Sequence, residues 1–262
     1  MLTQIKRKDF ANGSVFVLKT EDGYLLETTD TFLPFYTKDA IGRKQNTLKS
    51  YELGSRKDRF LIGVSCMSGC NVRCKFCATS KLKKCRSLTT KEMVDQVLFV
   101  LNENKEFSPS ESQEFKINWT RMGEPCLNIN NVRKAMDFIS NLYPNTHHYI
   151  STIGIKGSDF SWIQGNITLQ ISLHSLDEKR RDELIPYKNK MTIKELGEIR
   201  TNSNLKTTVN MTLVDEQDFD IETLKKYFDP KHFFIKLSPI NVNEISEKNC
   251  LGKGIIEGVN LI

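Results

Sequence analysis

Four of the seven cysteines of this 262-residue chain lie within twelve residues, in the stretch CMSGCNVRCKFC (residues 66–77). Cysteines at this density form disulfides, bind a metal ion or hold an iron–sulfur cluster. The basic start of the chain, MLTQIKRKDF, is not followed by the apolar segment of a signal peptide, which predicts a cytoplasmic protein. Thiols stay reduced in the cytoplasm, and the cysteine count is odd, so a metal or cluster site is favoured over a disulfide.

The spacing of these cysteines distinguishes a zinc site from a cluster site. A structural zinc site usually takes its four thiolates from two short pairs that a longer loop separates. Here Cys66, Cys70, Cys74 and Cys77 follow one another within a single loop, which is awkward for closing a tetrahedron. The last three alone, spaced as CxxxCxxC, would leave one iron of a four-iron cluster without a protein ligand and open to a small molecule. Zinc remains the alternative.

The segments around this loop have the pattern of an α/β protein. We expect strands at FLIGV (60–64), FKINWT (115–120), HYIST (148–152), TLQISL (168–173), KTTVNMTL (206–213) and FFIKLS (233–238). Five amphipathic stretches between them are expected to be helices: TTKEMVDQVLFVLNE, NINNVRKAMDFISNLY, SLDEKRRDELI, MTIKELGEIRT and DFDIETLKKYF. This alternation predicts parallel βαβ units. Six strands are too few for a closed barrel of eight, so we expect a partial (β/α)6 barrel with its site at the C-terminal ends of the strands.

The first 58 residues differ from this pattern. The stretch SVFVLKTEDGYLLET alternates in polarity on both sides of Asp22-Gly23, which predicts a β-hairpin with a tight turn. A Lys-rich stretch, residues 38–58, is expected to connect it to the barrel. We therefore predict a hairpin and linker over residues 1–58 and the barrel over residues 59–262. No apolar run approaches the ~20 residues that cross a bilayer, so no membrane association is expected.

Basic residues gather in three places, SRKDR (55–59), KLKKCR (81–86) and EKRR (178–181). The net charge is +6 with a pI near 8.8, which permits binding to nucleic acid without requiring it. Taken singly, each group is typical of a solvated surface. KLKKCR carries more weight as a phosphate contact because it follows the cysteines directly, and SRKDR and Arg121 are further candidates.

The cysteine loop resembles that of the radical S-adenosylmethionine superfamily. The matching features are CxxxCxxC after the first barrel strand and the aromatic Phe76 before the last cysteine. The resemblance implies that Cys70, Cys74 and Cys77 hold a [4Fe-4S] cluster whose open iron binds S-adenosylmethionine. It also implies an electron donor such as flavodoxin or ferredoxin, and cleavage of S-adenosylmethionine to methionine and a 5′-deoxyadenosyl radical.

Longer stretches resemble one branch of this superfamily, the RlmN/Cfr group of RNA adenosine methyltransferases. RMGEPCLNINNVRKAM is similar to the group's GMGEP segment, and STIG (151–154) to its STSG stretch. ISLHSLDEKRRDELIPYKNK resembles a run that begins SLHA in the group, and LSPIN (237–241) resembles its IPFN. The matches extend over roughly residues 15 to 241 in the right order, and they imply RNA or a nucleotide as the substrate.

The resemblance also assigns cofactor contacts by position. Glu124 would accept hydrogen bonds from the methionine ammonium, since a carboxylate suits that cation, and Gly123 would let the backbone approach closely. His174 would line the same pocket. Hydrogen bonds to the ribose or methionine parts would come from Ser151, Ser172 and Asn241.

The chain departs from the group where methyl transfer needs cysteines. The group has a second cysteine seven residues before the cluster motif, and this chain has Gly63 there; Cys66 stands where the group usually has serine. The methyl-carrying cysteine near the group's C-terminus and its N-terminal helical domain have no counterpart, and the spacing of Cys250 does not fit. We therefore expect cleavage of S-adenosylmethionine, while methyl transfer is in doubt. The remaining Cys85, Cys126 and Cys250 would be small buried residues or ligands of an auxiliary cluster.

Two other functions remain open. A radical enzyme that acts on a protein, such as a glycyl-radical activase, is also compact and has a GEP-type motif; it would leave a stable radical on its partner. A zinc-stapled nucleic-acid-binding module would be colourless with one zinc per chain, whereas a four-iron cluster would make the protein brown.

Overall fold

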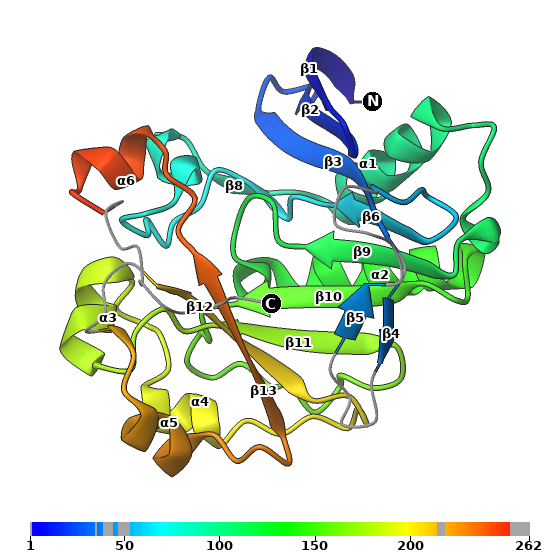
Figure 1. The fold of residues 1–262 in the computed structure, drawn as a ribbon. Coiled ribbons are helices and arrows are strands. Elements are labelled where there is room, and N and C mark those ends of the chain that lie inside the picture. Colours follow the sequence, from blue (N-terminus) through cyan, green and yellow to red (C-terminus); the bar gives the residue numbers. More distant parts are fainter. Residues whose placement is uncertain (1, 35, 39–43, 47–52, 214–217, 252–262) are drawn as a thin grey trace. The chain divides into compact units, whose positions relative to one another are not determined.

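The computed structural model describes residues 2–34, 36–38, 44–46, 53–213 and 218–251, which form two compact units (Figure 1). Unit 1 consists of Met1–Ser68, Ser87–Met122 and Asn128–Tyr149, and unit 2 of Gly69–Arg86, Gly123–Leu127 and Ile150–Ile262. The chain therefore passes between the units several times. The predicted domain boundary between residues 58 and 59 stays a prediction.

The strands of unit 1 lie side by side in one order. They are β1 (Thr3–Phe10), β2 (Gly13–Lys19), β3 (Leu25–Leu33), β6 (Arg59–Gly63), β9 (Glu114–Trp119) and the start of β10 (His147–Thr152). The first four pair antiparallel, and β6 pairs with β9 in parallel. The hairpin predicted around Asp22-Gly23 is confirmed: Gly23 has φ 87° and its N–H donates to the carbonyl of Thr20 at 3.0 Å.

Two features of the N-terminal region were not predicted. Strand β1 is exposed along its whole length, so it lacks the apolar alternation by which a strand is recognised. A short antiparallel pair is formed by β4 (Tyr36–Lys38), which ends where the stretch expected to be a linker begins, and β5 (Lys44–Asn46), within it. Other parts of that stretch lie outside the described residues.

The helices of unit 1 are α1 (Thr90–Glu103) and α2 (Ile129–Leu142), which pack against one another (Figure 1). Thr89 caps α1 through a capping box in which its side chain accepts from the Glu92 N–H. One side of α1 is fully buried through Met93, Val97 and Val100. Burying each such side chain contributes about 1.5–3 kcal/mol, so packing rather than helix propensity holds these helices in place.

Unit 2 has the same alternation of strand and helix. The end of β10, β11 (Ile167–Ser172), β12 (Thr207–Leu213) and β13 (Phe233–Pro239) follow one another, and the last three are parallel. Its helices are α3 (Glu178–Leu184), α4 (Ile193–Gly197), α5 (Ile221–Tyr227) and α6 (Glu244–Lys248). Shorter elements of the chain are β7 (Met67–Ser68), β8 (Arg86–Ser87), η1 (Ala78–Lys81), η2 (Pro109–Glu111) and η3 (Pro125–Asn128).

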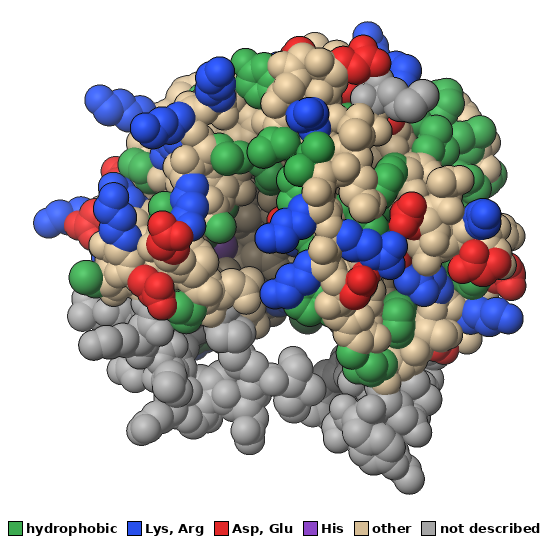
Figure 2. Space-filling model, turned by 90° about the horizontal axis from the view of Figure 1, so that it is seen from above, with side chains coloured by type: hydrophobic (Ala, Val, Ile, Leu, Met, Phe, Trp, Pro, Cys, Tyr) green, Lys and Arg blue, Asp and Glu red, His purple; other side chains and the backbone are tan. Residues whose placement is uncertain are grey.

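All six strands and all five helices expected from residue 60 onwards are present. The strands begin and end within about two residues of the predicted segments, whereas α3 to α5 are shorter than their amphipathic stretches. On the face shown in Figure 2, Lys and Arg side chains are interspersed with Asp and Glu rather than collected in one patch. Among the described residues, no helix has the length and apolar character needed to cross a membrane.

Candidate cofactor site

The three cysteines of the predicted cluster motif lie on one loop of unit 2. Cys70 and Cys74 are partly buried and pack against a cluster of apolar side chains. The buried residues of this apolar group are Val72, Ile153, Ile155, Leu184, Ile185 and Leu251. Cys77 precedes the short helix η1, and its N–H donates to the carbonyl of Cys74 at 3.2 Å. The loop therefore presents its thiols from a fixed backbone.

Segments far away in the sequence hold this loop. The N–H of Lys75 donates to the carbonyl of Leu184, at the end of α3, at 2.9 Å. The side-chain amides beside α6 hold two more carbonyls: Asn243 Nδ2 donates to Phe76 and Asn249 Nδ2 to Lys75, both at 2.9 Å. Figure 1 shows α6 next to the loop that contains η1.

Arg73, inside the motif, holds the basic segment that follows it. The residue has φ 61°, and its Nη1 donates to the carbonyls of Ser80 and Leu82 at 3.0 and 2.8 Å. Its Nη2 donates to the carbonyl of Lys83 at 3.2 Å. The KLKKCR segment is therefore attached to the cysteine loop, with the side chains of Lys83 and Lys84 exposed.

Glu124 is a buried carboxylate on the turn after β9. Only 3% of the residue is exposed. Its Oε1 accepts from the N–H of Cys126 and its Oε2 from the N–H of Ile153, both at 3.0 Å. Burial raises the pKa of Glu124, while the Thr152 side chain and the two backbone N–H groups counteract the rise. Gly123 beside it has φ 103°, a conformation that favours glycine, so this turn needs the predicted residue.

The other predicted contacts fall at the C-terminal ends of the strands. Ser151 on β10 and Ser172 on β11 are neighbours, with their Oγ atoms 3.2 Å apart. His174 follows β11 in a left-handed conformation (φ 65°), and its ring lies against that of Phe76 with centroids 4.7 Å apart. Asn241 lies beyond β13 with an exposed side chain; its described contact is through the backbone carbonyl, which accepts from the Asn243 amide.

The donor set of the loop fits an iron–sulfur cluster by its chemistry. Burial raises the pKa of the Cys70 thiol to about 12 and that of Cys74 well above its usual value, and charges on neighbouring cysteines raise both further. Such thiols need a cation to become ligands, and metal binding releases their protons. In the described part of the chain, no three His, Cys, Asp or Glu side chains converge to hold one metal ion. A cluster takes each thiolate on a different iron, so it does not require that convergence.

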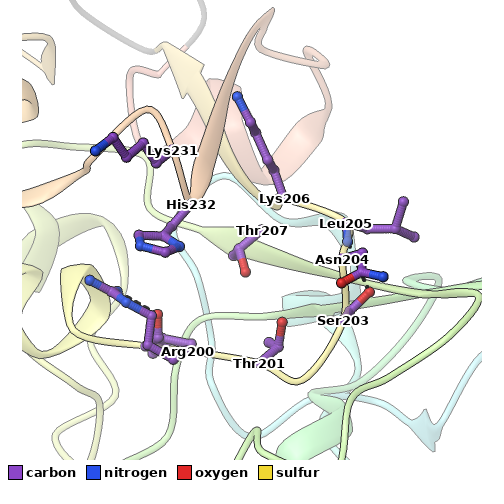
Figure 3. Close-up of a pocket in the computed structure, with 10 residues that line it drawn as sticks. Arg200, Thr201, Ser203, Asn204, Leu205, Lys206, Thr207, Lys231 and His232 are labelled. Atoms are coloured by element: carbon purple, nitrogen blue, oxygen red, sulfur yellow. Dashed lines mark hydrogen bonds between the residues drawn. The ribbon is translucent and has the colours of Figure 1, made fainter.

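A separate hollow of about 180 Å³ opens elsewhere in unit 2 (Figure 3). It lies where β12 and β13 begin, whereas the predicted site residues follow the ends of the strands. The side chains of Thr201 and Thr207 point toward one another, and Arg200, Lys206, Lys231 and His232 contribute the basic groups. Because parallel strands place their starts and ends at opposite edges of a sheet, this hollow is not part of the cofactor site.

Several arginines named as surface residues or candidate phosphate contacts also bind groups of the protein itself. Arg121 pairs with Glu27, and Arg56 binds Asp30, which is 3% exposed. Arg59 donates to the carbonyl of Pro34 at 2.7 Å. Arg181 of EKRR is completely buried, so the prediction of a solvated surface is wrong for that residue. The burial of Arg181 was not predicted, although Arg181 precedes the apolar Leu184 and Ile185 by three and four residues and so lies on the same face of α3.

Comparison with known proteins identifies the chain's relatives. The probable dual-specificity RNA methyltransferase RlmN of Aquifex aeolicus is 28% identical over 257 residues, which cover 92% of this chain and 66% of the relative. The probable RlmN of Chlorobium phaeobacteroides is 32% identical over 178 residues, which cover 65% and 49%. The crystal structure of a radical SAM methyltransferase from Sphaerobacter thermophilus matches 92% of this chain and 67% of that chain, with TM-score 0.70 and 23% identity. The chain is therefore similar to RlmN in sequence and to a radical SAM methyltransferase in fold.

The RlmN-like chain thus has the predicted fold class, an α/β fold of the radical SAM type. Streptococcus suis SuiB, solved with S-adenosylmethionine bound, matches 70% of this chain and 41% of SuiB, with TM-score 0.50 and 16% identity, which is a likeness of fold. No protein-family model matches the chain. The chain spans between about half and two thirds of the length of the two RlmN relatives described here.

Proposed function

We propose that this chain is a radical S-adenosylmethionine enzyme that acts on RNA. The observation that carries the proposal is the common location, in unit 2, of the Cys70-Cys74-Cys77 loop and the buried carboxylate of Glu124. Charges on Glu124 and on the thiols of Cys70 and Cys74 are close enough to affect one another's protonation. A set of thiolates next to a carboxylate is what a cluster and an amino acid ammonium group need.

The protein's own groups hold and orient the cofactors. The thiolates of Cys70, Cys74 and Cys77 would bind three irons of a [4Fe-4S] cluster, and the fourth iron would face S-adenosylmethionine. When bound, the cluster supplies the electron that splits S-adenosylmethionine into methionine and a 5′-deoxyadenosyl radical. Glu124 would accept from the methionine ammonium, because its carboxylate is already fixed by two backbone N–H groups.

The strand ends would position the rest of S-adenosylmethionine. The hydroxyls of Ser151 and Ser172 lie together and would hydrogen-bond the ribose or methionine part, with Asn241 as a further contact. His174 and Phe76 pack edge to face and would close the pocket against water. Excluding water matters because a carbon radical must meet its substrate before it reacts with other groups.

The names of the relatives support RNA as the substrate, since both are called RNA methyltransferases. Methyl transfer from S-adenosylmethionine to an adenine carbon is the reaction to test first. A reduced flavodoxin or ferredoxin would deliver the electron. None of the seven cysteines, all of which lie in the described residues, is in a disulfide, which suits the reducing cytoplasm.

The test is anaerobic reconstitution with iron and sulfide, followed by incubation with reductant, RNA and methyl-labelled S-adenosylmethionine. We expect about four irons per chain and release of 5′-deoxyadenosine. Labelled methyladenosine in the RNA would show that methyl transfer takes place without the group's cysteine pair. Replacing Cys70, Cys74 or Cys77 with Ala should abolish both iron binding and 5′-deoxyadenosine formation, whereas replacing the exposed Cys250 should not.

Each product separates one interpretation from another. Full activity of any of the three cluster-cysteine variants would overturn the assignment of the ligands. A colourless protein with one zinc per chain would replace the enzyme by a zinc-stapled module. 5′-Deoxyadenosine without RNA methylation would retain the radical chemistry and direct the search to a protein or small-molecule substrate.

A further inference from the structure

Arg181 on α3 is a buried cation whose surroundings in the described structure do not account for its charge. Its side chain is 0% exposed. Nη1 donates to the carbonyl of Met191 at 2.6 Å and Nη2 to that of Ile153 at 2.8 Å. The Nε atom is buried and has no hydrogen-bond partner among the described residues. Two neutral carbonyls and one orphaned donor are a poor environment for a guanidinium.

Among the described residues, no carboxylate lies within hydrogen-bond distance of the Arg181 guanidinium. The charged neighbour Glu178 is 4.0 Å away and its side chain is 48% exposed, so water screens the interaction. Burial lowers the pKa of Arg181 to about 10, which still leaves it positively charged at neutral pH. A buried charge is costly unless it is paired with an opposite charge, at several kcal/mol per ion. The location therefore calls for an anion that the described residues do not provide.

The nearest candidate partner is the cysteine loop. The helix of Arg181 ends at Leu184, whose carbonyl holds the loop through the Lys75 N–H at 2.9 Å. Leu184 belongs to the apolar cluster against which Cys70 and Cys74 pack, and the charge of a Cys74 thiolate acts on Arg181. The backbone of Ile153 contacts both charged groups: its carbonyl accepts from Arg181 and its N–H donates to Glu124.

We propose that Arg181 is the buried counter-cation of the iron–sulfur cluster and that it raises the cluster's reduction potential. This inference rests on the proposed function, since it requires a cluster on Cys70, Cys74 and Cys77. A four-iron core in its 2+ state bound by three thiolates carries one net negative charge, and accepting one electron adds a second. A fixed cation in a low-dielectric interior stabilises the reduced form more than the oxidised form. Arg181 thus makes the reduction of the cluster more favourable through its charge alone, without contacting the substrate.

The test compares four full-length proteins: wild type, Arg181→Gln, Arg181→Lys and Arg180→Gln. Arg180→Gln is the matched control because it removes the same charge from the adjacent position of α3, where Arg180 contacts Glu183 and Asp218. Iron per chain is measured after anaerobic reconstitution, and the midpoint potential by titration followed with electron paramagnetic resonance. We expect Arg181→Gln to change the ratio of reduced to oxidised cluster at least tenfold toward the oxidised form, a decrease of about 59 mV. Arg181→Lys and Arg180→Gln should stay near wild type.

The outcomes distinguish this inference from the function on which it rests. If the wild-type chain binds no iron, the proposed function fails; if it binds a cluster and Arg181→Gln leaves its potential unchanged, only the role of Arg181 fails. Should Arg181→Gln not fold, Arg181→Lys decides. A lysine that keeps the cluster at the wild-type potential shows that charge is the requirement. Loss of the cluster from a folded Arg181→Lys protein would assign the guanidinium a purely structural role and overturn the inference.

Discussion

The imidazole of His174 is held in one neutral form while it packs against Phe76. The Thr212 N–H donates to its Nδ1 at 3.0 Å, so the ring proton is on Nε2. The two ring centroids are 4.7 Å apart and the rings meet edge to face. Burial lowers the pKa of His174 to about 3, and the nearby positive charge of Arg181 acts in the same direction. The His174 ring that packs against Phe76 of the cysteine loop is therefore uncharged at neutral pH.

This environment predicts a loss of stability in acid. The pKa of His174 is below that of a histidine in the unfolded chain, so the unfolded state binds more protons between about pH 6.5 and pH 3. The contribution of the neutral His174 ring to the free energy of unfolding is complete above pH 6.5 and is lost as the pH falls through this window. One pKa unit is worth about 1.4 kcal/mol, so proton uptake by His174 on unfolding should lower the free energy of unfolding by about 2.5 kcal/mol between pH 7 and pH 4.5. The free energy of unfolding in urea measures the loss.

His174→Asn is the variant to compare. Asparagine tolerates the left-handed backbone at this position, and its side-chain oxygen can accept from Thr212, but it does not titrate. The variant should lose less stability between pH 7 and pH 4.5 than the wild type does. An identical pH dependence in wild type and His174→Asn would disprove the role of His174.

The carboxylate of Glu124 predicts a specific effect on cofactor affinity. Glu124→Gln preserves the shape but removes the charge that would attract the methionine ammonium. A hydrogen bond to a charged group contributes about 1.5–3 kcal/mol, so the Kd for S-adenosylmethionine should rise at least about tenfold. Isothermal titration calorimetry on the reconstituted protein measures Kd, and the iron content should stay at the wild-type level.

A stability effect has to be separated from this binding effect. The Gln amide would place an NH2 group against the N–H of Cys126 or Ile153, so we also expect a modest fall in thermal stability. Binding is therefore measured well below the unfolding temperature. The exposed Glu222, paired with Lys225, is the control, since Glu222→Gln should change neither quantity. Unchanged affinity in Glu124→Gln would remove this residue from the site.

Gly63 and Arg121, both departures from the RlmN/Cfr pattern, touch in unit 1. A Cβ atom on Gly63 would lie 2.7 Å from Arg121 Cδ and 2.3 Å from Thr29 Oγ1. The Gly63 N–H donates to that same hydroxyl at 3.2 Å, and Arg121 pairs with Glu27. The arginine side chain thus occupies space next to position 63, where the group has a cysteine.

The contact predicts that the cysteine cannot simply be restored. Gly63→Cys should lower the free energy of unfolding by about 1–3 kcal/mol, the usual cost of overpacking. Adding Arg121→Ala should recover part of this loss, because the larger group then has room. Urea unfolding of the two single variants and the double variant measures the coupling. Strictly additive effects would show that the two positions are independent.

The sequence predicts the elements well where one side of them is buried. The six strands after residue 60 are short apolar runs, and α1 and α2 have buried residues at helical spacing. Strand β1 was not predicted because backbone pairing with β2, rather than side-chain burial, stabilises it. Residue type and local order are sufficient to predict an element with one buried side. An exposed strand such as β1 can be predicted only when its partner strand is known.

The site was predictable in its motifs but not in its supports. The spacing points to the three cysteines, and the resemblance to the RlmN/Cfr group points to Glu124 and the serine pair. Arg73 binds three carbonyls of the next segment, and the α6 asparagines reach back over more than 160 residues. Such contacts depend on the folded path of the backbone and have no local pattern. The burial of Arg181 did have a local pattern, because helical spacing places Arg181 on the same face as Leu184. It was not predicted because a run of charged residues usually forms a solvated surface.

The attachment of KLKKCR to the cysteine loop predicts where RNA makes phosphate contacts. Lys83 and Lys84 are exposed beside the loop, so replacing both with Ala should weaken RNA binding and reduce the slope of log Kobs against log salt by about two. The matched control removes two lysines at the hollow of Figure 3, Lys206 and Lys231, at the opposite ends of the strands. Filter binding or fluorescence anisotropy at several salt concentrations gives both slopes. Equal reductions in the two double variants would mean that RNA binds all over the basic surface, because only a bound orientation that faces the cofactor site makes the two pairs differ.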